Sequence, residues 1–296
     1  VLSARQRDIN AGPYDDFLQT DASINRGNSG GPMFNLDGEV IGINTAIFSP
    51  SGGSIGIGFA IPSALARPVI ESLRQFGEVR RGWLGVRIQT VTEELAEGLR
   101  LPDESGALVA SVTEDGPADE GGVKQGDVIL EFDGRKVPDM RRLPRMVAET
   151  EIGKTVEVVV WRKGERETLN ITLGQLDDTV LAAAPATIQP EVSPDGSVSE
   201  LGLSLSSITP QLREEYGLED SAEGVVITEV EEVGSASEKG LRPGDLIVEV
   251  DQEEVSSPEE VAAQIAEAKN AGYRVVTLLV FREGDFQWVA VRLQDG

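Results

Sequence analysis

The feature that most constrains the fold is an internal repeat. The segment GALVASV at 106–112 recurs as GVVITEV at 224–230, GDVILEFDG at 126–134 recurs as GDLIVEVDQ at 244–252, and WRKGE at 161–165 recurs as FREGD at 281–285. The three offsets are 118, 118 and 120 residues. Such constant spacing indicates two copies of one module of about a hundred residues, the usual size of a domain.

Both copies show the same order of expected elements. A short strand leads into a short helix, at 92–100 and at 209–217, and later strands alternate β-branched and polar residues. The second copy predicts a longer helix over 258–270, with Ser257 as N-cap and Pro258 at its first position. In the first copy, Pro144 indicates a helix that starts near Arg142 or Leu143. Each copy therefore reads as an α+β domain.

The rest of the chain differs from the repeats. Residues 177–196 hold three prolines and no periodicity, which is typical of a semi-rigid linker. The first 79 residues predict a helix at about 63–76 and four short strands, at 17–21, 32–35, 39–48 and 57–62. The expected organisation is 1–79, a first repeat at 80–176, the linker 177–196 and a second repeat at 197–296.

Composition excludes several classes of function. The net charge is −25, and no cluster of Lys and Arg offers a surface for nucleic acid. The chain has no cysteine and no histidine, so disulfides are excluded and we expect neither a zinc site nor another cofactor. No apolar run reaches 18 residues, and the chain opens on Val1 without a signal peptide.

The stretch INRGNSGGP at 24–32 is a candidate nucleophile site. Glycines at 27, 30 and 31 allow backbone conformations closed to other residues, so that successive N–H groups can point into one concavity. The N–H groups of Gly27 and Ser29 are the natural donors for an oxyanion. A serine hydroxyl also needs a base within hydrogen-bond reach. Taken alone, the hexapeptide GNSGGP fits an ordinary glycine-rich turn equally well.

The context of this serine is more specific. QTDASINRGNSGGPMFNLDGEVIGINTAIF at 19–48, followed by IGFAIP at 57–62, resembles the HtrA/DegP family of trypsin-like serine proteases. RRGWLGV at 80–86 and SELGLSL at 199–205 match the carboxylate-binding loops of PDZ domains. The resemblance covers the whole chain. It implies a mostly β protein, in which part of the second β-barrel of a trypsin-like protease precedes two α+β PDZ domains.

The resemblance also implies roles in the first 79 residues. Ser29 matches the nucleophile, and Gly27 and Asn28 complete the oxyanion hole with it. Ile24 and Ile47 match positions that line a shallow apolar specificity pocket, suited to Val or Ala, although both also suit the core of a barrel. The family's substrate-pairing strand corresponds to Asn44, Thr45 and Ala46. The family's PDZ-sensing loop corresponds to segment 5–15, with Arg5 and Arg7. The loop beside the specificity pocket corresponds to segment 49–56. Either segment could equally be a plain connection.

In the first PDZ domain, the resemblance implies a site for peptide C-termini. Its carboxylate loop corresponds to Trp83, Leu84, Gly85 and Val86, with Arg81 as an added positive charge, and the strand continues through Arg87 and Ile88. An apolar wall corresponds to Leu143, Met146 and Val147, spaced by three and four residues, unless these are plain core.

The second PDZ domain keeps Leu201, Gly202 and Leu203, but Glu200 stands where the first has Trp83. Because an acidic side chain disfavours a carboxylate ligand, we expect weaker binding there and a role in contacts between subunits.

The family's triad runs His, Asp, Ser, and its His and Asp lie in the first barrel, which would precede Val1. No substitute base is evident, because all six lysines lie beyond residue 79 and Asp21 is a weak base. We therefore expect this chain to be inactive alone, with an incomplete barrel that is unstable by itself. The parent is expected to be a periplasmic quality-control endopeptidase that degrades misfolded proteins and forms trimers or their multiples. The alternatives are a non-catalytic two-PDZ peptide-binding adapter or chaperone-like scaffold, and an inactive homologue.

Overall fold

The computed structural model describes residues 1–7, 9, 15–25, 27–47, 56–176, 196–198, 201–219, 222–231 and 234–293. The chain divides into two compact units, one with residues 1–82 and 144–152 and the other with residues 83–143 and 153–296. Within the described part of the chain, no helix is long and apolar enough to cross a membrane.

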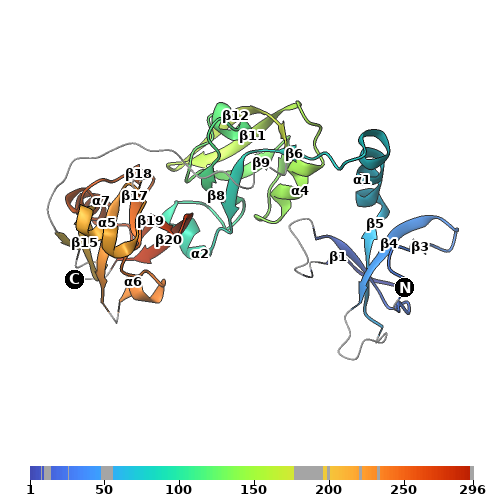
Figure 1. Ribbon diagram of the computed structural model, residues 1–296, viewed down its shortest axis with the longest axis horizontal. Helices are drawn as coiled ribbons and strands as arrows, with labels where there is room; N and C mark the ends of the chain where they lie inside the picture. Colours follow the sequence, from blue (N-terminus) through green and yellow to red (C-terminus); the bar gives the residue numbers. More distant parts are fainter. Residues whose placement is uncertain are drawn as a thin grey trace. The chain divides into compact units, whose positions relative to one another are not determined.

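The first unit contains an antiparallel sheet with strand order β1-β2-β5-β4-β3. The strands are β1 (Leu2–Arg7), β2 (Phe17–Thr20), β3 (Pro32–Phe34), β4 (Val40–Ile47) and β5 (Gly58–Pro62), and helix α1 (Ser63–Phe76) follows them (Figure 1). The helix and the four expected strands are confirmed to within one residue. The buried rings of Phe17 and Phe59 meet edge to face, with centroids 6.3 Å apart.

The first repeat forms a sheet of order β12-β11-β9-β8-β7, with β10 beside β9, and a two-stranded sheet of β13 and β6. The strands are β6 (Gly82–Trp83), β7 (Val86–Gln89), β8 (Ala107–Val112), β9 (Val128–Phe132), β10 (Arg135–Lys136), β11 (Thr155–Arg162), β12 (Glu165–Thr172) and β13 (Gly174–Gln175). The helices are α2 (Glu93–Gly98), α3 (Pro117–Glu120) and α4 (Arg142–Ala148). The helix start predicted near Arg142 is thus confirmed.

The second repeat has the order β14-β15-β16-β17-β19-β20, with β18 beside β17. The strands are β14 (Gly196–Val198), β15 (Leu203–Ser207), β16 (Val225–Val230), β17 (Leu246–Val250), β18 (Glu253–Glu254), β19 (Val275–Arg282) and β20 (Asp285–Arg292). The helices are α5 (Pro210–Tyr216), α6 (Ser235–Glu238) and α7 (Pro258–Asn270). The predicted start of α7 is confirmed, because the Ser257 side chain accepts a hydrogen bond from the Glu260 N–H. Of the expected linker, only Gly196 is described, and it begins β14.

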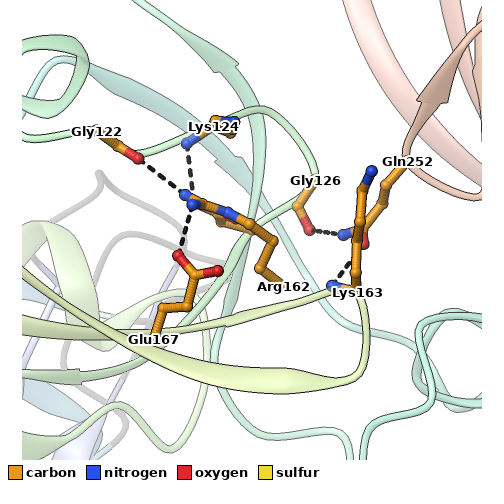
Figure 2. A network of polar contacts seen from close by, with 8 residues as sticks. Gly122, Lys124, Gly126, Arg162, Lys163, Glu167 and Gln252 are labelled. Carbon is orange, nitrogen blue, oxygen red and sulfur yellow. Dashed lines mark hydrogen bonds and ion pairs between the residues drawn. The ribbon is translucent and has the colours of Figure 1, made fainter.

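One buried ion pair explains why the motifs GD and WRKGE recur at a constant offset. Asp127 is fully buried, and it accepts hydrogen bonds from Nε and Nη2 of Arg162, both at 2.7 Å. In the second repeat, Asp245 receives the same two bonds from Arg282. Each arginine also donates to a glycine carbonyl, which for Arg162 is that of Gly122 (Figure 2). The motifs therefore tie the β8–β9 or β16–β17 connection to the final hairpin of each repeat.

Candidate functional site

Ser29 lies on an exposed loop between β2 and β3. Gly27 and Gly30 have φ angles of +96° and +83°, which residues other than glycine rarely adopt. The backbone conformation of the loop therefore explains why glycine stands at both positions. The hydroxyl of Ser29 contacts the carbonyl oxygen of Thr45 on β4 at 3.4 Å. The residues flanking Ser29 therefore hold its hydroxyl at the loop surface, beside β4.

The backbone N–H groups of this loop differ in whether the protein satisfies them. The N–H of Asn28 donates to the Asn25 carbonyl at 3.1 Å, and the N–H of Gly31 donates to the Asn28 carbonyl at 3.0 Å. Among the described residues, the N–H groups of Gly27 and Ser29 have no protein acceptor. The N–H of Asn28 is thus used inside the turn, and the oxyanion hole at Gly27, Asn28 and Ser29 stays a prediction.

The strand expected to pair with substrate is partly engaged by the same loop. The carbonyl of Asn44 accepts from the Gly30 N–H at 2.8 Å, and its own N–H donates to the Gly31 carbonyl at 2.9 Å. These bonds fix the serine loop against β4. The remaining edge, from Thr45 to Ile47, has no strand partner on that side among the described residues.

The candidate pocket residues differ in environment. Ile24 is 4% exposed and lies against Gly58, where an added Cβ would come within 2.7 Å of the isoleucine Cδ1. Ile47 is half-buried at the end of β4. Most of the segments 5–15 and 49–56 lies outside the described residues, although Arg5 and Arg7 are placed in β1.

The sequence offers no histidine, and no lysine near Ser29, as a base for its hydroxyl. The chain contains no histidine, and the first 79 residues contain no lysine. Asp21 is exposed, and a carboxylate is in any case a weak base for a serine hydroxyl. No group of three or more acidic side chains among the described residues is arranged to hold a metal ion.

The loop at 83–86, where the sequence predicts a carboxylate site, turns at a glycine with a left-handed backbone. Gly85 has φ +84°, and a Cβ there would lie 3.3 Å from Cδ of Pro117, so both conformation and space require glycine. Its carbonyl accepts from the Thr113 N–H at 2.8 Å, and the Leu84 carbonyl accepts from the Ala118 N–H at 2.8 Å. The segment 113–118 thus holds the loop in place by two backbone hydrogen bonds. In the sequence this segment is marked by the motif GPAD at 116–119, but its contact with the loop was not predicted.

The other residues expected at this peptide site are described as follows. Leu143, Met146 and Val147 on α4 are all buried, with at most 8% of their surface exposed. Arg81 is half-buried, and Arg87 is exposed on β7. Strand β7 is the edge of its sheet: β8 pairs with one side, and no described strand pairs with the other. That free edge can accept an extended peptide.

The second repeat has the same turn but not the same free edge. Gly202 has φ +69°, and its carbonyl accepts from the Glu231 N–H at 2.9 Å, as that of Gly85 does from Thr113. Here, however, β14 pairs antiparallel with β15, with Val198 opposite Leu203, and β14 also packs against α7. The edge of β15 is therefore covered by the chain itself. Glu200 lies outside the described residues.

Comparisons with known proteins agree with this architecture. Residues 2–70 match the trypsin family, and residues 82–173 and 189–281 each match a PDZ domain. Two relatives, from Rhizobium meliloti and Brucella suis, are both named "Probable periplasmic serine endoprotease DegP-like". They are 44% and 42% identical over the whole of this chain, which covers 57% and 55% of their lengths.

Solved structures agree as well. The structure of the HtrA-type protease AlgW with a decapeptide is 48% identical, with a TM-score of 0.53 over 60% of this chain and 55% of that one. The fold and the serine loop therefore define a trypsin-like protease segment followed by two PDZ domains. The chain belongs to the DegP-like family of HtrA proteases.

Proposed function

We propose that the whole protein is a periplasmic serine endopeptidase of protein quality control, which degrades unfolded or misfolded proteins. The observation that carries this proposal is the Ser29 loop. Its two positive-φ glycines expose the hydroxyl and leave the N–H groups of Gly27 and Ser29 free to stabilise an oxyanion. The names of the relatives and the absence of a competing metal or thiol chemistry in the sequence point the same way.

In this mechanism Ser29 attacks the substrate carbonyl, and the two N–H groups receive the developing negative charge. The base that removes the hydroxyl proton comes from outside these 296 residues, because they contain no histidine. Ile24 and Ile47 would offer a small apolar surface to the side chain that precedes the scissile bond. Thr45 to Ile47 would pair with the substrate backbone.

The first PDZ domain would bind peptide C-termini and regulate the protease. The positive φ of Gly85 turns the loop, and β7 offers a free strand edge beside it. In the second PDZ domain β14 covers the corresponding edge of β15, which supports the expectation of weaker binding there for a reason other than Glu200. We also propose that the whole protein assembles as a homo-oligomer, a trimer or its multiples.

The test is hydrolysis of unfolded casein by the full-length protein and its Ser29→Ala variant. Loss of the nucleophile is expected to lower the rate on the order of a million-fold while leaving binding of a C-terminal peptide unchanged. The 296-residue chain alone should show no turnover, and a fluorophosphonate probe should label Ser29 in the full-length protein only. Undiminished hydrolysis by the Ser29→Ala variant would contradict the proposal.

A further inference from the structure

The two PDZ domains share one apolar cluster, in addition to the core that the second domain builds by itself. A single cluster contains buried side chains from both domains: Val91, Leu95, Ala96, Leu99, Leu108, Val128 and Leu130 from the first, and Val275, Leu279, Trp288 and Ala290 from the second. Trp288 on β20 is 1% exposed, and its indole N–H donates to the Val109 carbonyl of the first domain at 3.2 Å. The second domain therefore completes the hydrophobic packing of the first.

Two glutamines, one from each domain, bind the backbone of the other domain with both ends of the amide. Gln89 donates from Nε2 to the Trp288 carbonyl at 3.0 Å and accepts from the Trp288 N–H at 2.9 Å. Gln252 donates from Nε2 to the Gly126 carbonyl at 2.5 Å and accepts from the Lys163 N–H at 2.9 Å (Figure 2). Each side-chain amide thus satisfies one backbone N–H group and one backbone carbonyl of the other domain.

The two bridges differ in what they hold. Gln252 lies in the β17–β18 turn and reaches the turns of the first domain at Gly126 and Lys163. Gln89 is the last residue of β7, the edge strand beside the carboxylate loop, and it binds β20. A second residue of β7, Arg87, forms an ion pair with Asp285 at the start of β20. Half of the four-residue strand β7 is therefore in polar contact with β20.

We propose that β20 of the second PDZ domain positions β7 of the first, so that the affinity of the first domain for a peptide C-terminus depends on the second domain. This inference rests on the proposed peptide binding at β7. A ligand that adds to a sheet edge forms main-chain hydrogen bonds with groups that must be held in line, and an edge ordered beforehand lowers the conformational entropy lost on binding. Gln89 is a positioning residue, and it orders β7 through its two hydrogen bonds to the backbone of Trp288 on β20.

The experiment compares two matched variants of the 296-residue chain, Gln89→Ala and Gln252→Ala. Each removes one amide bridge between the same two domains, and only the first touches β7. A labelled peptide with a free C-terminal valine, and its amidated twin as a control, are titrated by fluorescence anisotropy. Gln89→Ala is expected to weaken binding about fivefold or more, whereas Gln252→Ala should stay within about twofold of the unmodified chain.

Hydrogen exchange without any ligand separates positioning from direct contact between Gln89 and the peptide. Amides of 86–89 should exchange faster in the Gln89→Ala variant and at the unmodified rate in the Gln252→Ala variant. Circular dichroism and urea unfolding confirm the fold of both variants. Unchanged exchange in Gln89→Ala, or an equal loss of affinity in both variants, would overturn the inference. If the unmodified chain bound free and amidated peptides equally, the proposed peptide site would fail, while the exchange data would still decide whether β20 orders β7.

Discussion

Stability of the two PDZ domains should depend on pH, and the buried carboxyl group of Glu249 should contribute to this dependence. This residue of β17 is 9% exposed and lies opposite Glu254 of β18. Burial is the main cause that raises the pKa of Glu249 from 4.5 to about 7; the carboxylates of Glu254 and Glu253 raise it further, and the Lys163 ammonium opposes them. Glu249 is therefore protonated at pH 5 in the folded protein and mostly ionised in the unfolded chain.

The sign and size of the effect follow from this difference. A carboxyl group whose pKa is higher in the folded state stabilises the fold below the unfolded pKa, and that contribution is lost as the pH rises through the folded pKa. A pKa of 4.5 in the unfolded chain and about 7 in the folded protein corresponds to about 3 kcal/mol. The contribution of Glu249 to the free energy of unfolding should fall by about this amount between pH 4.5 and pH 8, and the Glu249→Gln substitution should remove this contribution.

The assay is urea unfolding at 25 °C across this pH range, followed by tryptophan emission, to which the buried Trp288 contributes together with Trp83 and Trp161. At pH 4.5 the Glu249→Gln variant should match the unmodified chain, and at pH 8 it should be more stable by up to about 3 kcal/mol. Glu254→Gln is the control variant. The Glu254 side chain is exposed and affects the pKa of Glu249 only through its charge, so this variant keeps the buried carboxyl group of Glu249. Parallel stability curves for the unmodified chain and Glu249→Gln would refute the reasoning.

Three further predictions concern the repeats. Asp127→Ala should lower the free energy of unfolding by about 3–5 kcal/mol in urea, because it leaves Arg162 without its buried partner. Lys154→Ala, which removes the more exposed ion pair with Asp133, should lower it by about 1 kcal/mol or less. Ser197→Pro should break the β14–β15 pairing and speed hydrogen exchange of residues 203–205; unchanged exchange would mean that β14 does not protect β15. Gly85→Ala should reduce binding of a free C-terminal peptide more than tenfold by anisotropy, because the loop needs φ +84° and the space beside Pro117; affinity equal to that of the unmodified chain would rule out this turn as the carboxylate site.

Much of the fold follows from local signals in the sequence. Helix α7 could be placed from Ser257 and Pro258, because a cap and a first-turn proline act within one turn of the chain. Strand β1 was not predicted, since LSARQR carries polar residues where a strand signal needs alternating apolar ones. The glycine turn around Ser29 was predictable for the same local reason as α7.

The contact between the PDZ domains was not predictable, because alternation identifies an apolar face but not what covers it. Leu108, Val128 and Trp288 each fit the core of their own repeat in the sequence, yet they meet in a cluster that both domains build. Gln89 and Gln252 carried no signal at all, since a single glutamine in a strand or a turn is ordinary. The backbone partner of Gln89 is 199 residues away along the chain, and those of Gln252 are 126 and 89 residues away.

The joint cluster limits how this protein can be dissected. A fragment that ended at residue 176 would present Leu108, Val128 and Leu130 to water, and the complementary fragment would present Leu279 and the indole of Trp288. Exposed apolar patches of this kind promote self-association. Fragments cut between the two PDZ domains should therefore dimerise or precipitate, and affinities measured on them would describe an aggregate rather than the tandem. A fragment that keeps residues 80–293 together avoids this exposure and is the smaller piece suited to ligand titrations.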